Sequence, residues 1–250
     1  MRAAACICAA LLAACSDTGP GGAPGPGPGP GPGPGPGEDL CELDGQTFTG
    51  EGTYYDADGS GNCSFPASPG DLLVAAMNDL DYDGSAVCGA CAAIDGPDGS
   101  VTVRIVDRCP ECARGDIDMS PQAFERIAPI AAGRVPISWR YVACEPAGAI
   151  VYHFKEGSNQ WWTAVQIRNH RHPIDTLEFQ AEDGSFRTVP RESYNYFVEE
   201  AGMGPGPYTF RVTDVLGNVV EDTGVPLVEN GESTGARQFP ACASAQGTSP

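Results

Sequence analysis

The chain has 250 residues, which is room for about two ordinary domains. It carries 33 acidic residues against 14 basic ones, and its formal net charge at pH 7 is −19. This balance excludes nucleic acid and an anionic membrane surface as binding partners, because phosphate groups are bound by Lys and Arg side chains that release counterions. A neutral polysaccharide remains allowed, and we interpret the acidity as a source of solubility.

Residues 1–15 have the order of a secretory signal. Arg2 comes first, a short apolar stretch follows, and residues 12–15 read Leu-Ala-Ala-Cys. The apolar stretch is too short to span a bilayer, which takes about 20 residues. The ending resembles the bacterial lipobox, so we expect Cys15 to become the lipidated first residue of a secreted protein held at the cell surface or the outer membrane. An ordinary signal peptide cut near Cys15 is the alternative.

Residues 16–38 are predicted to be a linker. From Gly19 to Gly37 the chain alternates Gly and Pro almost without interruption and lacks the triplet period of collagen, so it cannot bury a core. The prolines favour an extended polyproline II conformation, which can hold a folded domain up to about 60 Å from a membrane surface.

After the signal, eight of the eleven cysteines remain: Cys41, Cys63, Cys88, Cys91, Cys109, Cys112, Cys144 and Cys242. An even number of cysteines in an exported protein indicates disulfide bonds. The two Cys-x-x-Cys pairs at 88–91 and 109–112 also fit the spacing of a zinc ribbon, which is the alternative. Because the chain carries an export signal, we favour disulfides and expect neither a metal nor a cofactor.

Residues 39–145 predict a small β-barrel. Apolar and polar residues alternate over 101–106 and again over 135–139, which is the periodicity of strands. Between them Ser120 can cap a short helix that has Pro121 at its first position and Phe124 on its buried face.

Residues 146–242 predict a β-sandwich. Strand-like alternation recurs at 150–155, 165–167, 177–179 and 208–212, and Leu216-Gly217-Asn218 predicts a hairpin turn. The small, polar residues 243–250 are expected to form a disordered tail.

Several motifs together resemble one family. In the first block these are Gly-Thr-Tyr-Tyr (52–55), Cys-Gly-Ala-Cys (88–91), Val-Asp-Arg-Cys-Pro (106–110), Gly-Asp-Ile-Asp-Met-Ser-Pro-Gln-Ala-Phe (115–124) and Trp-Arg-Tyr-Val (139–142), which look like the N-terminal barrel of expansins. In the second block, residues 155–162, 165–170, 193–198 and 212–214 resemble the carbohydrate-binding domain of bacterial expansins. The resemblance implies an all-β chain, with a six-stranded double-psi β-barrel packed against an immunoglobulin-like β-sandwich.

By this resemblance Asp118 is the acid that the family requires, and Thr53 and Asp107 line a polysaccharide groove with Tyr54 and Glu111 nearby. A protonated carboxyl at Asp118 could donate a hydrogen bond or a proton to a glycosidic oxygen, as a general acid does. The simpler interpretation of such residues is that they cap turns or helices, and this fits Asp116.

Hydrolysis of a glycoside normally needs a second carboxylate at a defined separation. Asp56 lies near the place of the second Asp of related barrel endoglucanases, but one position out of step, and a shift by one residue turns a side chain to the other face of a strand. We therefore interpret Asp56 as a turn residue and expect non-hydrolytic loosening of polysaccharide. The alternatives are a glycan-cleaving enzyme, either an endoglucanase or a lytic transglycosylase with Asp118 as general acid, and a plain binding module with an inert barrel.

One position departs from the bacterial pattern. Where bacterial expansins often carry an aromatic residue two positions after the first groove Asp, this chain has Cys109, which together with Cys112 looks like the Cys-Pro-x-Cys of plant and fungal relatives. Tyr54 or Tyr55 is a candidate to compensate for the missing ring. The pattern of cysteine-rich relatives implies the pairs Cys63–Cys88, Cys91–Cys144 and Cys109–Cys112, which leaves Cys41–Cys242.

Trp161 and Trp162 are adjacent, so in a regular strand they would face opposite sides and one of them would be buried. The resemblance instead places both with Tyr194 in a row on the surface, which requires a strand end or a bulge near residues 157–160. Flat rings suit the apolar C–H faces of a sugar chain. We expect a monomer whose partner is cell-wall polysaccharide, cellulose first, with xylan and peptidoglycan as further candidates.

Overall fold

The computed structural model describes residue 43 and residues 45–241. The predicted lipoprotein signal, the Gly-Pro linker, the pair Cys41–Cys242 and the predicted tail lie outside the described residues. Within the described part of the chain, no helix is long and apolar enough to cross a membrane.

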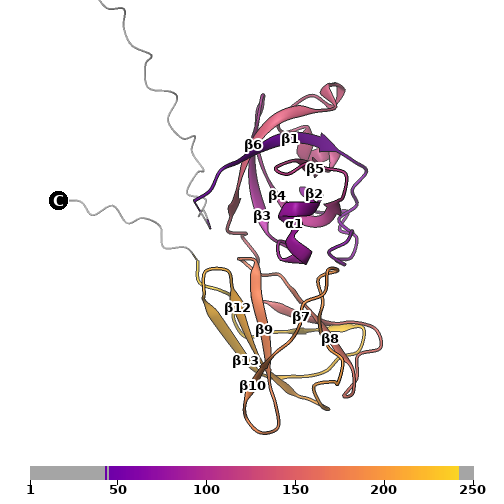
Figure 1. Ribbon diagram of the computed structural model, residues 1–250, viewed down its shortest axis with the longest axis vertical. Coiled ribbons are helices and arrows are strands. Elements are labelled where there is room, and N and C mark those ends of the chain that lie inside the picture. The colour runs from indigo at the N-terminus through magenta and orange to yellow at the C-terminus, as the bar shows by residue number, and fades with distance from the viewer. Residues whose placement is uncertain (1–42, 44, 242–250) are drawn as a thin grey trace, which may run out of the picture. The chain divides into compact units, whose positions relative to one another are not determined.

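The first domain is a closed barrel of six strands in the order β1-β5-β2-β4-β3-β6 (Figure 1). The strands are β1 (Phe48–Tyr54), β2 (Val74–Asn78), β3 (Cys91–Gly96), β4 (Gly99–Cys109), β5 (Ile117–Met119) and β6 (Val135–Val142). Two pairs, β1 with β5 and β2 with β4, are parallel, and the other pairs are antiparallel. The alternation predicted at 101–106 and 135–139 falls inside β4 and β6.

The barrel interior is filled by the apolar side chains of these alternating strands. Val103 and Ile105 of β4 are buried, and Trp139 of β6 is fully buried. The Trp139 ring stacks on Phe48 with 4.3 Å between ring centroids, and its Nε1 donates a 2.8 Å hydrogen bond to the carbonyl of Gly115. Burying one large apolar side chain stabilises a fold by about 1.5–3 kcal/mol, so this interior holds the strands in register.

Short helices connect strands of the barrel. Between β2 and β3 lie α1 (Asp79–Tyr82) and η1 (Asp83–Ser85), and between β5 and β6 lie α2 (Pro121–Phe124) and η2 (Ile130–Ala132). The predicted start of α2 is confirmed, because the Ser120 hydroxyl accepts a 3.1 Å hydrogen bond from the amide of Ala123, and Pro121 opens the helix. Phe124 is buried in the core of the barrel, as its place on the helix predicts.

The second domain is a β-sandwich of two four-stranded antiparallel sheets, β10-β9-β12-β13 and β11-β8-β7-β14. The strands are β7 (Val151–Phe154), β8 (Thr163–Arg168), β9 (Ile174–Gln180), β10 (Phe186–Thr188), β11 (Phe197–Glu199), β12 (Tyr208–Asp214), β13 (Val219–Val225) and β14 (Gly231–Thr234). Rings from both sheets meet in the core, where Tyr152 stacks on Phe210 with 5.1 Å between centroids. The predicted hairpin turn joins β12 to β13, and Gly217 has the positive φ of 80° that the turn needs.

Three disulfides stabilise the barrel: Cys63–Cys88, Cys91–Cys144 and Cys109–Cys112. These are the three implied pairs whose cysteines both lie in the described residues. The four cysteines with zinc-ribbon spacing are all used in these disulfides, so their sulfur atoms carry no thiolate for zinc and the zinc alternative is not realised.

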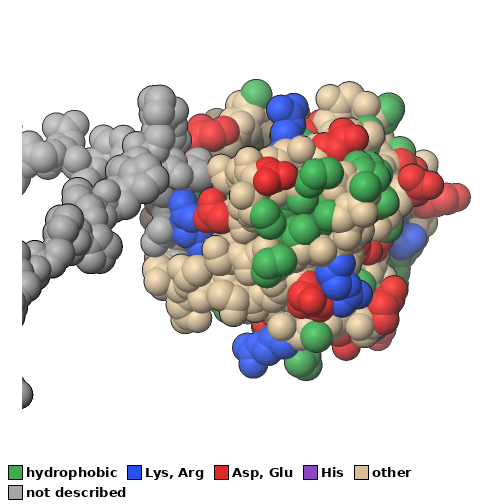
Figure 2. All heavy atoms as spheres, turned by 90° about the horizontal axis from the view of Figure 1, so that it is seen from above, with side chains coloured by type: hydrophobic (Ala, Val, Ile, Leu, Met, Phe, Trp, Pro, Cys, Tyr) green, Lys and Arg blue, Asp and Glu red, His purple; other side chains and the backbone are tan. Residues whose placement is uncertain are grey.

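The acidic side chains do not gather in one block on the face of the molecule seen in Figure 2. They are distributed among hydrophobic and basic side chains. Several acidic side chains of the described residues form ion pairs, such as Asp71 with Arg104 and Glu51 with Arg134. This distribution agrees with the interpretation of the acidity as a source of solubility.

Candidate functional site

Four residues on neighbouring barrel strands form one row across the sheet. Thr53 of β1 pairs with Asp118 of β5, Asp118 pairs with Ala76 of β2, and Ala76 pairs with Asp107 of β4. Residues that are directly opposite one another on adjacent strands point to the same face of a sheet. Two strand spacings separate the backbones of Asp107 and Asp118, about 10 Å, and the small side chain of Ala76 keeps the space between them open. We call this row the barrel groove.

A β-bulge turns Asp107 into the groove. The register between β2 and β4 shifts by one residue, so that Ala75 pairs with Ile105 but Ala76 pairs with Asp107. Val106 is the extra residue, and both Ile105 and Val106 are fully buried. Without the bulge, strand alternation would point Asp107 in the same direction as Ile105, toward the core.

Asp118 is half-buried and keeps its proton more strongly than an ordinary aspartate. Burial raises the pKa of its carboxyl, and the negative charges of Glu111 and Asp107 raise it further. A 2.6 Å hydrogen bond from the Thr53 hydroxyl to Asp118 Oδ1 acts in the opposite direction. The neutral, hydrogen-bond-donating form of Asp118 therefore persists to higher pH than it would in water.

Asp107 is held by backbone amides. Its Oδ1 accepts hydrogen bonds from the amide of Asn62, at 2.6 Å, and from its own neighbour Arg108, at 2.8 Å. Gly61 allows the loop to approach this closely, because a Cβ atom at that position would lie 2.3 Å from Asp107 Cγ. Sequence reasoning missed Gly61 and Asn62, since nothing in the local pattern shows that this loop crosses β4.

The two tyrosines at the end of β1 have different surroundings. The Tyr54 ring packs against the buried ring of Phe124, with 5.1 Å between centroids, on the core side of the barrel. Tyr55 is half-buried beside the carboxylates of the groove. Burial, followed by the charge of Asp107, raises the pKa of its hydroxyl, which therefore remains a neutral donor. The structure thus brings Tyr55, rather than Tyr54, to the two acids.

The other predicted acids lie around this row. Asp56 is exposed at the centre of a three-residue turn in which the amide of Ala57 donates to the carbonyl of Tyr55, as a turn residue should. Asp116 accepts hydrogen bonds from the amides of Glu51 and Ala113, so it fixes a turn. Glu111 is exposed in the loop that follows β4, where its charge acts on Asp118. No group of three metal-ligating side chains suited to an ion occurs among the described residues.

On the sandwich, the tryptophans lie where a strand begins. Asn159 and Trp162 form a β-bridge around a tight turn, and this is the strand end expected near residues 157–160. Trp161 stands in the turn and is 71% exposed. Trp162 and Tyr194 are partly buried and pack against a small outer cluster that includes Tyr196, separate from the sandwich core.

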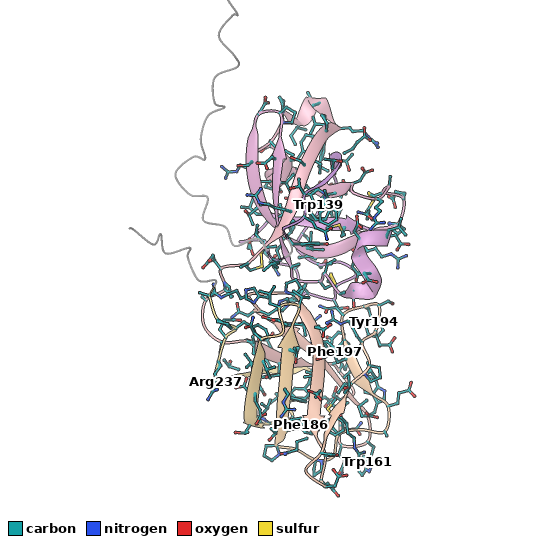
Figure 3. The ribbon with its side chains drawn as sticks, turned by 60° about the vertical axis from the view of Figure 1, so that its left-hand side comes forward. Trp139, Trp161, Phe186, Tyr194, Phe197 and Arg237 are labelled. Carbon is teal, nitrogen blue, oxygen red and sulfur yellow. A yellow bond between two sulfur atoms is a disulfide. The ribbon has the colours of Figure 1, made fainter. Side chains whose placement is uncertain are left out.

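We call Trp161, Trp162 and Tyr194 the aromatic surface, and the buried ring of Tyr196 supports it from within the outer cluster. Figure 3 shows Trp161 and Tyr194 along the same side of the sandwich. The rings of Tyr194 and Tyr196 lie 5.9 Å apart, and Lys155 Nζ lies 5.8 Å from the centre of the Tyr196 ring. Tyr196 was not predicted, although its spacing of two residues from Tyr194 is the signal that could have indicated it.

Comparison with known proteins finds several expansins among the relatives of this chain. A family model described as lytic transglycolase matches residues 74–139. Expansin-YoaJ of Bacillus subtilis is 39% identical over 181 residues, which are 69% of this chain and 77% of that protein. Expansin-A26 of Oryza sativa subsp. japonica is 30% identical over 68% of this chain and 58% of its own length.

Solved structures agree with these relatives. The crystal structure of the apo expansin of Clavibacter michiganensis is 32% identical and superimposes with a TM-score of 0.74 over 79% of this chain and all of that one. A mutant of the same protein, solved in complex with cellohexaose, gives the same TM-score, identity and coverage.

Proposed function

Because the chain belongs to the expansin family and folds as a double-psi β-barrel followed by a β-sandwich, we propose that it binds cell-wall polysaccharide and loosens it without hydrolysis. Cellulose-like β-glucan is the first target, and the complex of a related expansin with cellohexaose supports this choice. The observation that carries the proposal is the half-buried, proton-retaining Asp118 in a row with Thr53 and Asp107.

In this proposal the barrel groove competes for hydrogen bonds between glucan chains. The neutral carboxyl of Asp118 donates to a glycosidic or hydroxyl oxygen, while Thr53 holds one of its two oxygens in place. Asp107 offers a carboxyl acceptor for sugar hydroxyls, fixed by two backbone amides. Tyr55 adds a neutral hydroxyl donor beside it. Together these groups offer donors and acceptors that replace those of a neighbouring glucan chain, without a covalent step.

The aromatic surface provides adhesion. A soluble, acidic protein gains nothing from exposing a large ring such as Trp161 unless the ring has a partner. Sugar rings present apolar C–H faces that pack against flat aromatic rings, and this contact is insensitive to charge. The sandwich therefore docks on the polysaccharide and the barrel groove acts beside it.

Cleavage of a glycan with Asp118 as general acid is the alternative function. It needs a base or nucleophile at a defined separation from the acid. Asp56 is turned away into an exposed turn, and Asp107 Oδ1 already accepts hydrogen bonds from two backbone amides. These features favour binding over cleavage.

A binding panel tests the proposal. The mature protein is incubated with cellulose, xylan, chitin and peptidoglycan, and the bound fraction and the released sugar are measured for each. We expect the highest bound fraction on cellulose, with no sugar released from any of them, and creep of a clamped wall strip in the presence of the protein. Release of sugar from soluble β-glucan or from peptidoglycan would establish the alternative, and binding without creep would reduce the chain to a plain binding module.

For the location of the protein, the sequence of residues 12–15 supports a lipid anchor on Cys15 after secretion, at the cell surface or the outer membrane. Mass spectrometry of protein from its native cell should show an acylated Cys15 as the first residue, and Cys15→Ser should release the protein from the membrane fraction. An unmodified N-terminus at another position would contradict the anchor.

A further inference from the structure

The loop that holds Asp107 also reaches the sandwich. Residues 59–63, which we call the bridging segment, follow β1 and cross the end of β4. The amide of Cys63 donates to the carbonyl of the bulge residue Val106 at 3.1 Å, and the amide of Asn62 donates to Asp107 Oδ1 at 2.6 Å. The disulfide Cys63–Cys88 ties the segment to the rest of the barrel.

The side chain of Asn62 points the other way, to the sandwich. Its Nδ2 donates to the carbonyl of Ser193 at 2.9 Å and to the hydroxyl of Tyr82 at 2.9 Å. The Tyr82 hydroxyl in turn donates to the same Ser193 carbonyl at 3.0 Å. Ser193 is the residue immediately before Tyr194. Asn62 and Tyr82 therefore fix the backbone on the N-terminal side of Tyr194, a residue of the aromatic surface.

The next residue of the segment, Cys63, fixes the backbone on the C-terminal side of Tyr194. The carbonyl of Cys63 accepts hydrogen bonds from Asn195 Nδ2, at 3.1 Å, and from Gln166 Nε2, at 2.8 Å. Asn195 follows Tyr194 directly, is buried, and has a positive φ of 64°, so the turn that carries Tyr194 has little freedom of its own. Gln166 is fully buried on β8, and because it lies four residues after Trp162, strand alternation points both side chains to the same face of the sheet.

From these contacts we infer that Asn62 is a positioning residue that sets the barrel groove and the aromatic surface in a fixed register, so that one polysaccharide chain is held by both at once. Its backbone amide fixes Asp107, and its side chain fixes the turn of Tyr194. This inference rests on the proposed function and names how its two surfaces cooperate.

The physical reason is effective concentration. When two binding surfaces on one molecule are rigidly placed for the same polymer, engagement of the first makes the second step intramolecular, and the overall affinity exceeds that of either surface alone. A looser connection lowers the effective concentration at the second surface without touching the contacts of either. Long glucans should therefore depend on Asn62, whereas ligands too short to reach both surfaces should not.

Asn62 is suited to a direct test. It is exposed, and it has no positive φ, so alanine at this position leaves no cavity in the core and creates no backbone strain. Alanine also keeps the backbone amide that holds Asp107, so the groove remains intact. Tyr82→Phe is a second, independent variant, because it removes the other donor to the Ser193 carbonyl and keeps the ring.

The experiment measures affinity against ligand length. Cellobiose, cellohexaose and insoluble cellulose are titrated with the parent protein, Asn62→Ala, Tyr82→Phe and the control Gln180→Ala. The control also loses a hydrogen bond from a side-chain amide to a backbone carbonyl, that of Gly184, at an exposed position of the sandwich. For Asn62→Ala we expect an unchanged cellobiose affinity and about a tenfold or greater loss on cellulose. Tyr82→Phe should change in the same direction, Gln180→Ala should match the parent, and the melting temperatures should stay close together.

The outcomes separate the inference from the function on which it rests. A parent protein that does not bind cellulose overturns both. A parent that binds, with an Asn62→Ala variant whose dependence on ligand length is unchanged, overturns the inference alone. An equal loss on short and long ligands also overturns it, because Asn62 would then act within a single surface.

Discussion

In the barrel groove the polar side chains stand on three strands, β1, β5 and β4, whereas on the sandwich the aromatic rings stand mainly on turns. Strand pairing places Thr53, Asp118 and Asp107 at one level of the sheet, and backbone amides then fix Asp107. Trp161, by contrast, stands in a tight turn and is largely exposed. The groove is thus a rigid arrangement of polar and ionisable groups, and the aromatic surface is an arrangement of uncharged rings in which Trp161 is exposed and Trp162 and Tyr194 are partly buried.

This difference reflects what each surface has to do. An acid that stays protonated depends on burial and on the distance to other charges, so small displacements change its pKa. Adhesion through flat rings depends mainly on contact area, so it tolerates small displacements and declines gradually as rings are removed. We therefore expect a single substitution in the groove to remove most of the wall-loosening activity, and each substitution in the aromatic surface to lower the affinity for cellulose by a small step.

The largest expected effect concerns the stability of the barrel, because every disulfide that the structure describes includes barrel cysteines. The cross-links close loops with sequence separations of 53, 25 and 3 residues for Cys91–Cys144, Cys63–Cys88 and Cys109–Cys112. Chain entropy then predicts losses of about 4, about 3.5 and about 1.6 kcal/mol in the free energy of unfolding. Urea titrations of the three paired Cys→Ala variants should follow that order. The largest loss at Cys109–Cys112 would contradict it.

The next effect tests how rigid the groove is. Gly61→Ala would place a Cβ atom 2.3 Å from Asp107 Cγ, so the loop or the carboxylate must move. We expect the variant to lose about 1–3 kcal/mol of stability and most of its wall-loosening activity, and to keep the contacts of the Trp161 ring with cellulose. Gly70→Ala is the matched control, because nothing lies within 4 Å of its added Cβ. Equal activity of the two variants would show that the groove is not rigid.

Much of this contrast could be predicted from the sequence, but not all of it. Alternation predicted β4 and β6, and the motif around Asp118 predicted the acid. β2 gave no alternation because all five of its residues are buried. The bulge at Val106 depends on the pairing of β4 with β2, which are distant in sequence, so neither the orientation of Asp107 nor the spacer role of Ala76 could be seen locally.

The same reason explains the other residues that were missed. Tyr55 and Asn62 acquire their roles from contacts with β4 and with the turn of Tyr194, more than 40 residues away in each case. On the sandwich, the local pattern alone would have buried one of Trp161 and Trp162, and it was the resemblance to expansins that implied a strand end near residues 157–160. Local patterns indicated the elements, and long-range pairing decided which side chains meet.

A smaller effect is expected on the aromatic surface. Trp161→Ala removes one exposed ring, which we expect to lower the affinity for cellulose by about 1 kcal/mol, or roughly fivefold, and to leave the melting temperature unchanged. Leu80→Ala is a control on an exposed side chain of the barrel, 69% accessible, that belongs to neither surface. Binding isotherms on insoluble cellulose measure the difference, and equal isotherms for the two variants would exclude Trp161 from the binding surface.

The smallest effect is a difference in pH dependence. Because the pKa of Asp118 is raised, its neutral form persists above the pH at which an ordinary aspartate ionises and is lost as the pH rises through the raised pKa. The contribution of Asp118 to the free energy of unfolding follows the same pH dependence. It is present at low pH and is lost as the pH rises through the raised pKa, because the half-buried carboxyl then becomes charged. Creep measured from about pH 4 to about pH 8 should therefore decline with pH, while cellulose binding stays constant. Parallel pH profiles for creep and binding would contradict this separation.

The central claim is that loosening depends on the acid of the barrel groove, whereas the rings of the aromatic surface serve adhesion alone, and Asp118→Asn tests it most directly. Cellulose binding and wall creep are measured on the same preparations of the parent, Asp118→Asn and Asp98→Asn, a control on an exposed acid in the turn between β3 and β4. We predict that Asp118→Asn loses creep, because an amide is a weaker hydrogen-bond donor than a protonated carboxyl and cannot give up a proton. The variant should keep its cellulose affinity within about twofold, because the substitution conserves the volume of the groove and leaves the aromatic surface untouched. Loss of binding together with creep, or a sugar-releasing activity of the parent that disappears in Asp118→Asn, would contradict the account.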